Sequence, residues 1–187
     1  LAPDATPSSV IELMLATFDQ RVLPEIEGRL AGKAVFDLAL GDYRPMTVYD
    51  VVTLASIVER EAVVPEERPV IASVYLNRLD PAHIEETALR LSADPTVQYA
   101  KGFDAATGNW WNPMLPGEGQ TVDSPYNTFR VQGLPPGPIC SPGLASILGV
   151  LNAADTDYLY FHAVGDGSHV FAATLEEHLQ NQAQHSP

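Results

Sequence analysis

The stretch Thr47–Ala62, TVYDVVTLASIVEREA, carries the clearest structural signal in the chain. Small and aliphatic side chains recur in it at three- and four-residue steps, which is the spacing of one face of an amphipathic helix. These side chains are Val48, Val51, Val52, Ala55, Val58 and Ala62. Thr47 and Asp50 approximate a capping box at the start of the stretch. We therefore expect a helix here with one buried face.

One carboxylate falls inside this apolar face. At about 100° per residue, Glu59 lies between Val48 and Val52, whereas Arg60 points to solvent. A carboxyl group among apolar neighbours is desolvated, which raises its pKa and keeps it protonated near neutral pH, as a general acid requires. Ser56, one turn earlier, could orient Glu59 by a hydrogen bond. Helix geometry alone favours a structural glutamate that reaches water or pairs with an arginine, because such residues greatly outnumber catalytic ones.

A second glutamate, Glu61, lies near the other edge of the same face and is the main rival for the role of acid. We expect Glu61 to be a supporting charge, paired with Arg60, Arg68 or Arg78.

Signals for helix ends and turns divide the rest of the chain. Helices are expected from Ser8 or Ser9 to about Leu23, within 24–44, from Pro65 onward, over 144–151 and over 175–184. Segments 102–123 and 134–142 are rich in Gly and Pro and read as loops, while 96–100 is a strand or a short helix. Residues 158–164 and 169–174 flank Gly165–Ser168, which is a hairpin signal. Long helices followed by a late hairpin favour an α+β fold, with a helical N-terminal half that carries Glu59 and a small antiparallel sheet.

Composition restricts the class of partner. The chain has 187 residues and a formal net charge of −14, which argues against binding nucleic acid or anionic lipid, because both are polyanions. With 45% hydrophobic residues it can bury a sizeable core. The single cysteine, Cys140, excludes an internal disulfide, and no run of about 18 apolar residues is present to span a membrane. A neutral or amino-sugar polymer is a compatible ligand.

Several short sequence motifs (called words below) occur in the order found in one enzyme family. They are 54–61 (LASIVERE), 72–79 (ASVYLNRL), 90–97 (RLSADPTV), 126–128 (YNT), 133–139 (GLPPGPI), 141–143 (SPG), 158–161 (YLYF) and 169–171 (HVF). Together they resemble the MltG/YceG-like endolytic murein transglycosylases over residues 47–178, which is most of the chain. So many words in one order carry a low risk of a false match.

The resemblance implies a cell-wall enzyme that cuts peptidoglycan glycan strands internally. The family breaks the bond from N-acetylmuramic acid to N-acetylglucosamine without adding water, and it leaves a 1,6-anhydro-muramoyl end. Its catalytic glutamate stands in the word Ala-Ser-Ile-Val-Glu, which carries over to Glu59 as the single general acid and base. No cofactor is implied.

The resemblance also implies an organisation and a location. Residues 47–187 would form the YceG-like catalytic domain, and residues 1–46 a helical segment left from the linker to a missing LysM-like region. The family's usual membrane anchor would lie outside these residues, with the domain in the periplasm or on the outer face of the cytoplasmic membrane. Its partners would be glycan strands and, by family analogy, peptidoglycan synthases beside which it terminates nascent strands.

Substrate contacts are expected from polar and aromatic residues in the matched words. The candidates are Asp94, Thr96, Tyr126, Asn127, Thr128 and His169. Asp94 and Thr96 could bind sugar hydroxyls or amides, or cap a turn. The next three offer a ring and polar groups suited to an N-acetyl sugar, or form an ordinary loop. The histidine matches a family position and could hydrogen-bond to the glycan, although a lone histidine is structural by default.

The loop 103–123 lies outside the matched words, so its residues inherit no family role. Trp110 and Trp111 in this loop could stack on sugars, but the preferred interpretation is that they form the loop's own small core.

Cofactor chemistry finds no support in the sequence. His83, His178 and His185 show no metal-ligand spacing with other ligand types, so no metal is expected. A pyridoxal phosphate enzyme, which an older aminodeoxychorismate lyase-like label of the family suggests, needs a Schiff-base lysine. Only Lys33 and Lys101 are present, and neither stands in a cofactor motif. The competing function is a non-catalytic glycan-binding module, which would keep an aromatic groove without a buried glutamate.

Overall fold

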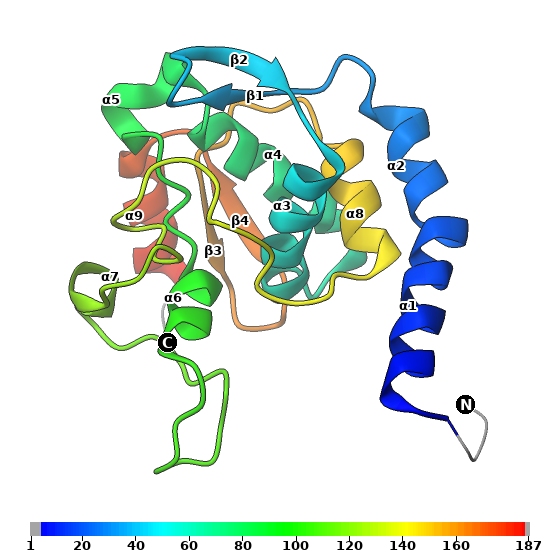
Figure 1. Ribbon diagram of the computed structural model, residues 1–187. Helices are drawn as coiled ribbons and strands as arrows, with labels where there is room; N and C mark the ends of the chain where they lie inside the picture. The colour runs from blue at the N-terminus through cyan, green and yellow to red at the C-terminus, as the bar shows by residue number, and fades with distance from the viewer. Residues whose placement is uncertain (1–4, 186–187) are drawn as a thin grey trace.

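The computed structural model describes residues 5–185 and confirms the α+β class. Three helices that pack against one another form its centre: α3 (Val48–Glu61), α4 (Arg68–Arg78) and α8 (Leu144–Leu151). Strands within these residues pair into two antiparallel hairpins, β1–β2 and β3–β4 (Figure 1). The remaining helices surround this centre.

The expected capping box starts α3. Thr47 Oγ1 accepts a hydrogen bond from the Asp50 backbone N–H at 3.2 Å, and Asp50 Oδ2 accepts one from the Thr47 N–H at 2.7 Å. These bonds satisfy backbone donors that the first helical turn leaves free.

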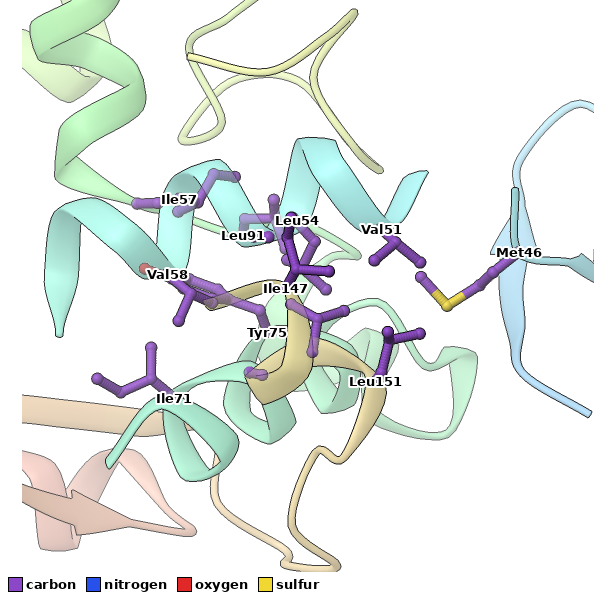
Figure 2. Close-up of a cluster of buried hydrophobic side chains, with 14 of the residues drawn as sticks. Met46, Val51, Leu54, Ile57, Val58, Ile71, Tyr75, Leu91, Ile147 and Leu151 are labelled. Carbon is purple, nitrogen blue, oxygen red and sulfur yellow. The ribbon is translucent and has the colours of Figure 1, made fainter. Parts of the chain in front are cut away.

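The buried face of α3 supplies most of the core. Val51, Leu54, Ala55, Ile57 and Val58 are fully buried. Figure 2 shows Leu54 and Val58 converging with Tyr75 of α4 and Ile147 of α8. The predicted amphipathic helix is therefore confirmed, and α3 is the axis around which the domain packs.

Two helices precede this centre, namely α1 (Pro7–Arg21) and α2 (Leu23–Leu30). Thr6, and not Ser8 or Ser9 as expected, caps α1, and the Ser9 hydroxyl accepts the return bond from the Thr6 N–H. No residue of α1 is buried, and in Figure 1 this helix stands off the body of the protein. Helix α2 enters the core through Ile26.

A hairpin that the sequence pattern did not predict joins α2 to α3. It consists of β1 (Ala34–Asp37) and β2 (Asp42–Pro45). Arg44 fastens this hairpin to α3, because its guanidinium donates to Asp50 at 2.6 and 2.9 Å, and to Asp37 at 2.9 Å. Four residues per strand are too few for apolar alternation to stand out.

The second half of the chain follows the expected order. The elements are η1 (Pro65–Glu67), η2 (Pro81–His83), α5 (Ile84–Thr87), α6 (Asp94–Lys101), α7 (Glu118–Thr121), α8, β3 (Tyr160–Ala163), β4 (His169–Ala172) and α9 (Leu175–His185). Segment 96–100, expected as a strand or a short helix, belongs to helix α6. Helix α7 interrupts the expected loop 102–123. Segment 134–142 is irregular as expected. No helix within residues 5–185 is both long and apolar enough to cross a bilayer.

Asp50 makes the start of α3 sensitive to acid. Burial raises the pKa of Asp50, but hydrogen bonds from Arg44 and Thr47 outweigh burial, so its pKa lies below the ordinary value of 3.8. A carboxyl group with a pKa lowered by folding stabilises the protein above its unfolded pKa. That contribution is lost as the pH falls through the folded pKa.

Asp50→Asn should therefore lower the free energy of unfolding at pH 7 by roughly 2 kcal/mol, since it removes the charge that faces Arg44 and weakens the cap. The deficit should shrink as the pH falls from about 4 toward the lowered pKa at which the folded wild-type carboxylate is itself protonated. Urea unfolding at pH 7 and pH 3 measures it, with the exposed Asp155→Asn as control. An equal deficit at both pH values would contradict the role given to the Asp50 charge.

Candidate active site

A cavity of about 670 Å³ opens where the ends of α3 and α6 meet the β3–β4 hairpin and α9. Its walls are apolar in part, and a group of polar side chains faces into it. The polar lining residues are Glu61, Tyr75, Arg78, Ser92, Asp94, Tyr160, His162, His169, His178 and Gln182. A concave, partly apolar site with convergent polar groups is typical of ligand binding.

Glu61 is the last residue of α3, and it lines this cavity. The Tyr75 hydroxyl donates a hydrogen bond to Glu61 Oε1 at 2.7 Å. Burial raises the pKa of Glu61 to about 7; the Tyr75 hydrogen bond opposes this shift, the Asp94 carboxylate adds to it, and Arg60 lowers it. A carboxyl group with a pKa near 7 can donate a proton and take one back at neutral pH.

Two buried residues of α4 line the cavity beside Glu61, and Glu61 bonds to Tyr75 rather than to one of the arginines expected from the sequence. Tyr75 is buried, and burial raises its pKa well above 10, so its hydroxyl remains a donor to Glu61. Arg78, also buried, donates to the carbonyls of Arg90 and Leu159 at 2.9 and 3.0 Å. It thereby joins the loop before α6 to the start of the C-terminal hairpin. In the sequence, the signal for Tyr75 was its place in the motif 72–79, which also contains Arg78.

Glu59 lies in different surroundings from those expected. Its Oε2 accepts hydrogen bonds from the Gly143 N–H at 3.2 Å and from the Ser146 hydroxyl at 2.6 Å. Arg68 Nε donates to the same hydroxyl at 3.1 Å. Gly143 is the N-cap of α8, so Glu59 joins α3 to the N-terminus of α8, where a carboxylate is favourable. It is not among the residues that line the cavity.

Ser56 does not orient Glu59, which corrects the expectation from the sequence. Its hydroxyl donates to the Thr53 carbonyl at 2.7 Å and accepts from the Ile139 N–H at 2.9 Å. Ser56 is fully buried, and it holds the Pro- and Gly-rich segment 134–142 against α3.

Three of the six expected substrate residues are interior. Thr96 and Thr128 are buried, and their hydroxyls lie 2.9 Å apart. Asn127 is buried as well, and its amide donates to the carbonyls of Gly119 and Val122 at 3.1 and 2.8 Å. These side chains hold loop segments together, and the cavity lining includes none of them.

The other three are closer to the surface. Asp94, at the start of α6, is exposed and lines the cavity beside Glu61. His169 also lines it, with Nδ1 2.7 Å from Glu67 Oε2. Tyr126 is partly buried and packs against Tyr99 outside the cavity, with the two rings tilted by 58°.

The described residues bring no three His, Cys, Asp or Glu side chains into a metal-binding group. Neither lysine lines the cavity: Lys33 borders a separate hollow, and Lys101 pairs with Glu118 at 2.7 Å. The cavity therefore offers no Schiff-base lysine, and its chemistry rests on carboxyl, phenol, imidazole and guanidinium groups.

Comparisons with known proteins agree on one family. A model of the YceG-like family matches residues 1–184. The chain is 39% identical over 133 residues to the endolytic murein transglycosylase of Bacillus subtilis, covering 71% of this chain and 33% of that protein. It is 32% identical over 181 residues to the endolytic murein transglycosylase of Streptococcus pneumoniae D39, covering 96% of this chain and 29% of that protein. The chain thus spans about a third of the length of these curated relatives.

A solved structure supports the same grouping. The crystal structure of a yceG-like protein from Listeria monocytogenes is similar with a TM-score of 0.74 at 32% sequence identity. The similarity covers 96% of this chain and 50% of that chain.

The raised pKa of Glu61 has a cost in stability. A carboxyl group whose pKa rises from 4.5 to about 7 on folding disfavours the folded state above its unfolded pKa, and this cost is complete above about pH 7. Glu61→Gln should therefore raise the free energy of unfolding at pH 8 by up to about 3 kcal/mol, and the gain should vanish at pH 4.

Urea unfolding at the two pH values tests this prediction. Glu59→Gln is the matched control: it weakens the acceptor for Gly143 and Ser146, so it should cost about 1 kcal/mol. A Glu61→Gln protein less stable than wild type at pH 8 would show that the Glu61 carboxylate is not desolvated.

Proposed function

The chain belongs to the YceG-like family, and we propose that it carries the active site of an endolytic murein transglycosylase. The substrate would be the glycan strand of peptidoglycan, cut between N-acetylmuramic acid and N-acetylglucosamine to leave a 1,6-anhydro end. The names of its relatives supply the substrate class. One observation carries the chemistry: the Glu61 carboxyl group, with a pKa of about 7, faces a cavity of about 670 Å³.

The reaction needs a single group that first gives and then takes a proton. Protonated Glu61 donates to the glycosidic oxygen as its bond to C1 of the muramoyl sugar breaks. The C6 hydroxyl of the same sugar attacks C1, and the Glu61 carboxylate takes the proton of that hydroxyl as the anhydro ring closes. The nucleophile belongs to the substrate, so the attack has the advantage of an intramolecular reaction, and Glu61 ends in its starting state.

The choice of Glu61 over Glu59 rests on their neighbours. Both stand in the word that resembles the family signature, and the sequence favoured Glu59. In the structure, Glu59 is engaged by Gly143 and Ser146 at the start of α8, whereas Glu61 faces the cavity. Glu59 would then serve to hold α3 and α8 together.

Asp94 is a second carboxyl group in the same cavity. In hydrolytic glycosidases a second carboxylate acts as nucleophile or activates water. In the proposed reaction Asp94 has neither role, and its negative charge favours the protonated, donating form of Glu61. Products with a reducing end would instead indicate hydrolysis, for which Asp94 would be the candidate second carboxylate.

A peptidoglycan substrate implies action outside the cytoplasmic membrane. We place the domain there, in a full-length protein that is membrane-anchored by residues outside this chain. Internal cutting would release nascent glycan strands. By analogy with the family, we propose that this takes place beside peptidoglycan synthases.

Mass spectrometry of the products from purified peptidoglycan tests the proposal. The wild-type chain should release internal fragments that end in 1,6-anhydro-muramic acid. Glu61→Gln should reduce their yield by at least about a hundredfold, because proton transfer by a positioned group contributes on this scale. Glu59→Gln, matched in chemistry and two residues away, should retain most activity when assayed as folded protein. The reverse result for the two variants would assign the acid to Glu59, and glycan binding without cleavage by the wild type would favour a binding module.

The pH dependence gives an independent test. The reaction starts from protonated Glu61, so kcat/KM should fall above about pH 7. Tyr75→Phe removes a hydrogen bond that lowers the pKa of Glu61, so the fall should move to higher pH. Tyr158→Phe, which alters a tyrosine outside the cavity lining, serves as control. A fall that stays in place, or moves to lower pH, in Tyr75→Phe would exclude Glu61 as the titrating acid.

A further inference from the structure

A row of aromatic side chains lies outside the cavity. The ring centroid of Tyr99 is 4.8 Å from that of Tyr126 and 6.4 Å from that of Trp111. Tyr49 extends the row past Tyr126, because a side chain at Gly137 would meet the hydroxyls of both tyrosines. The row therefore runs from the first turn of α3, through α6, to the loop 102–117.

Arg60 ends the row on the side of the cavity. Its guanidinium carbon lies 4.1 Å from the ring centroid of Trp111, and its side chain is exposed. We refer to Tyr49, Tyr126, Tyr99, Trp111 and Arg60 as the aromatic ledge.

The ledge combines exposed rings with a fixed base. Tyr49 and Tyr99 are 59% and 39% exposed, which leaves ring surface open to solvent. Trp111 and Tyr126 are partly buried and pack against the hydrophobic core, so the row is anchored. The Tyr49 hydroxyl donates to the Pro136 carbonyl at 3.1 Å, which ties the far end of the row to the segment 134–142.

Three segments contribute residues to both the ledge and the cavity. In each of these segments, a ledge residue lies within a few positions of a cavity residue. The pairs, with the ledge residue first, are Arg60 and Glu61 on α3, Tyr99 and Asp94 on α6, and Trp111 and Met114 in the loop 102–117. The ledge thus lies near the cavity on the side of Glu61, which directly follows Arg60 in α3.

The geometry points to the aromatic ledge as a binding surface for the glycan strand beyond the sugars held in the cavity. Pyranose rings carry apolar C–H faces that stack on aromatic rings, and a row of rings suits a repeating polymer. Cutting within a strand requires sugars on both sides of the broken bond. No residue of the ledge lines the cavity, so the ledge is additional surface on which such sugars could bind. The exposed Arg60 cation suits the carboxylate that each muramoyl lactyl group carries once its peptide is removed. The nature of this ligand rests on the proposed function.

Binding and cleavage can be measured separately on glycan strands freed of their peptides and sorted by length. Binding is measured with the Glu61→Gln protein, so that no substrate is consumed. Adding Tyr99→Ala should weaken the binding of long strands by roughly three- to tenfold, the effect of losing one stacking ring. Tyr49→Ala, at the far end of the row, should act in the same direction and only on strands long enough to reach it.

The control is Tyr43→Ala, which removes a tyrosine that is 48% exposed on β2 and belongs to neither the ledge nor the cavity. It should leave the binding of long strands unchanged. In the cleaving protein, Tyr99→Ala should raise KM for long strands more than for short ones, with kcat nearly unchanged. Circular dichroism of each variant establishes that it is folded.

The outcomes separate this inference from the proposed function. Equal binding of long strands by folded Tyr99→Ala, Tyr49→Ala and unaltered protein would overturn the ledge, even if 1,6-anhydro products form. A loss of binding with Tyr43→Ala as large as that with Tyr99→Ala would overturn it too. A loss confined to the ledge variants, in a chain that releases no products, would support the ledge while the proposed reaction fails.

Discussion

The enclosure of α3 is the constraint on which the rest of the molecule depends. Its start is fixed by the capping box and by Arg44, and its sides are covered by α4, α8 and the segment 134–142, which Ser56 holds. In its last turn, two side chains that point in different directions lie in different surroundings. Glu59 meets the N-terminus of α8, and Glu61 meets the cavity. The proposed acid therefore lies at one end of a helix that is otherwise a structural axis.

Apolar periodicity and turn chemistry were sufficient for the elements that signal themselves locally. The observed bounds of α8 agree with the expected 144–151, and the Gly165–Ser168 turn lies between strands as expected. The β1–β2 hairpin was not predicted, because no pattern within its short strands signals it. It is held to α3 by the contact of Arg44 with Asp50. Helix α1 shows the converse: its residues favour a helix, yet none is buried, since helix signals report local preference and not packing.

The roles of the site residues depended on contacts that local sequence does not contain. Glu59 and Glu61 are two positions apart, which separates them by about 200° around the helix. A shift of two positions therefore determines whether a carboxyl group meets α8 or the cavity. Helix α8 and much of the cavity wall come from the last third of the chain, far from both glutamates in sequence. Asn127 and Thr128 were expected at the substrate because they are polar. In irregular backbone, however, buried polar side chains are needed to satisfy backbone groups that no helix or strand pairs.

The position of α9 in the wall of the cavity has a consequence for the order of assembly. Helix α9 is the last helix of the described chain, whereas the α3–α4 pair is made much earlier and packs on α8 without it. A nascent or clipped chain could thus hold a compact core and still leave Glu61 open to water, without the burial that raises its pKa. Synthesis of α9 would then complete the wall of the site, and this delays the reactive state of an enzyme proposed to cut its own cell wall.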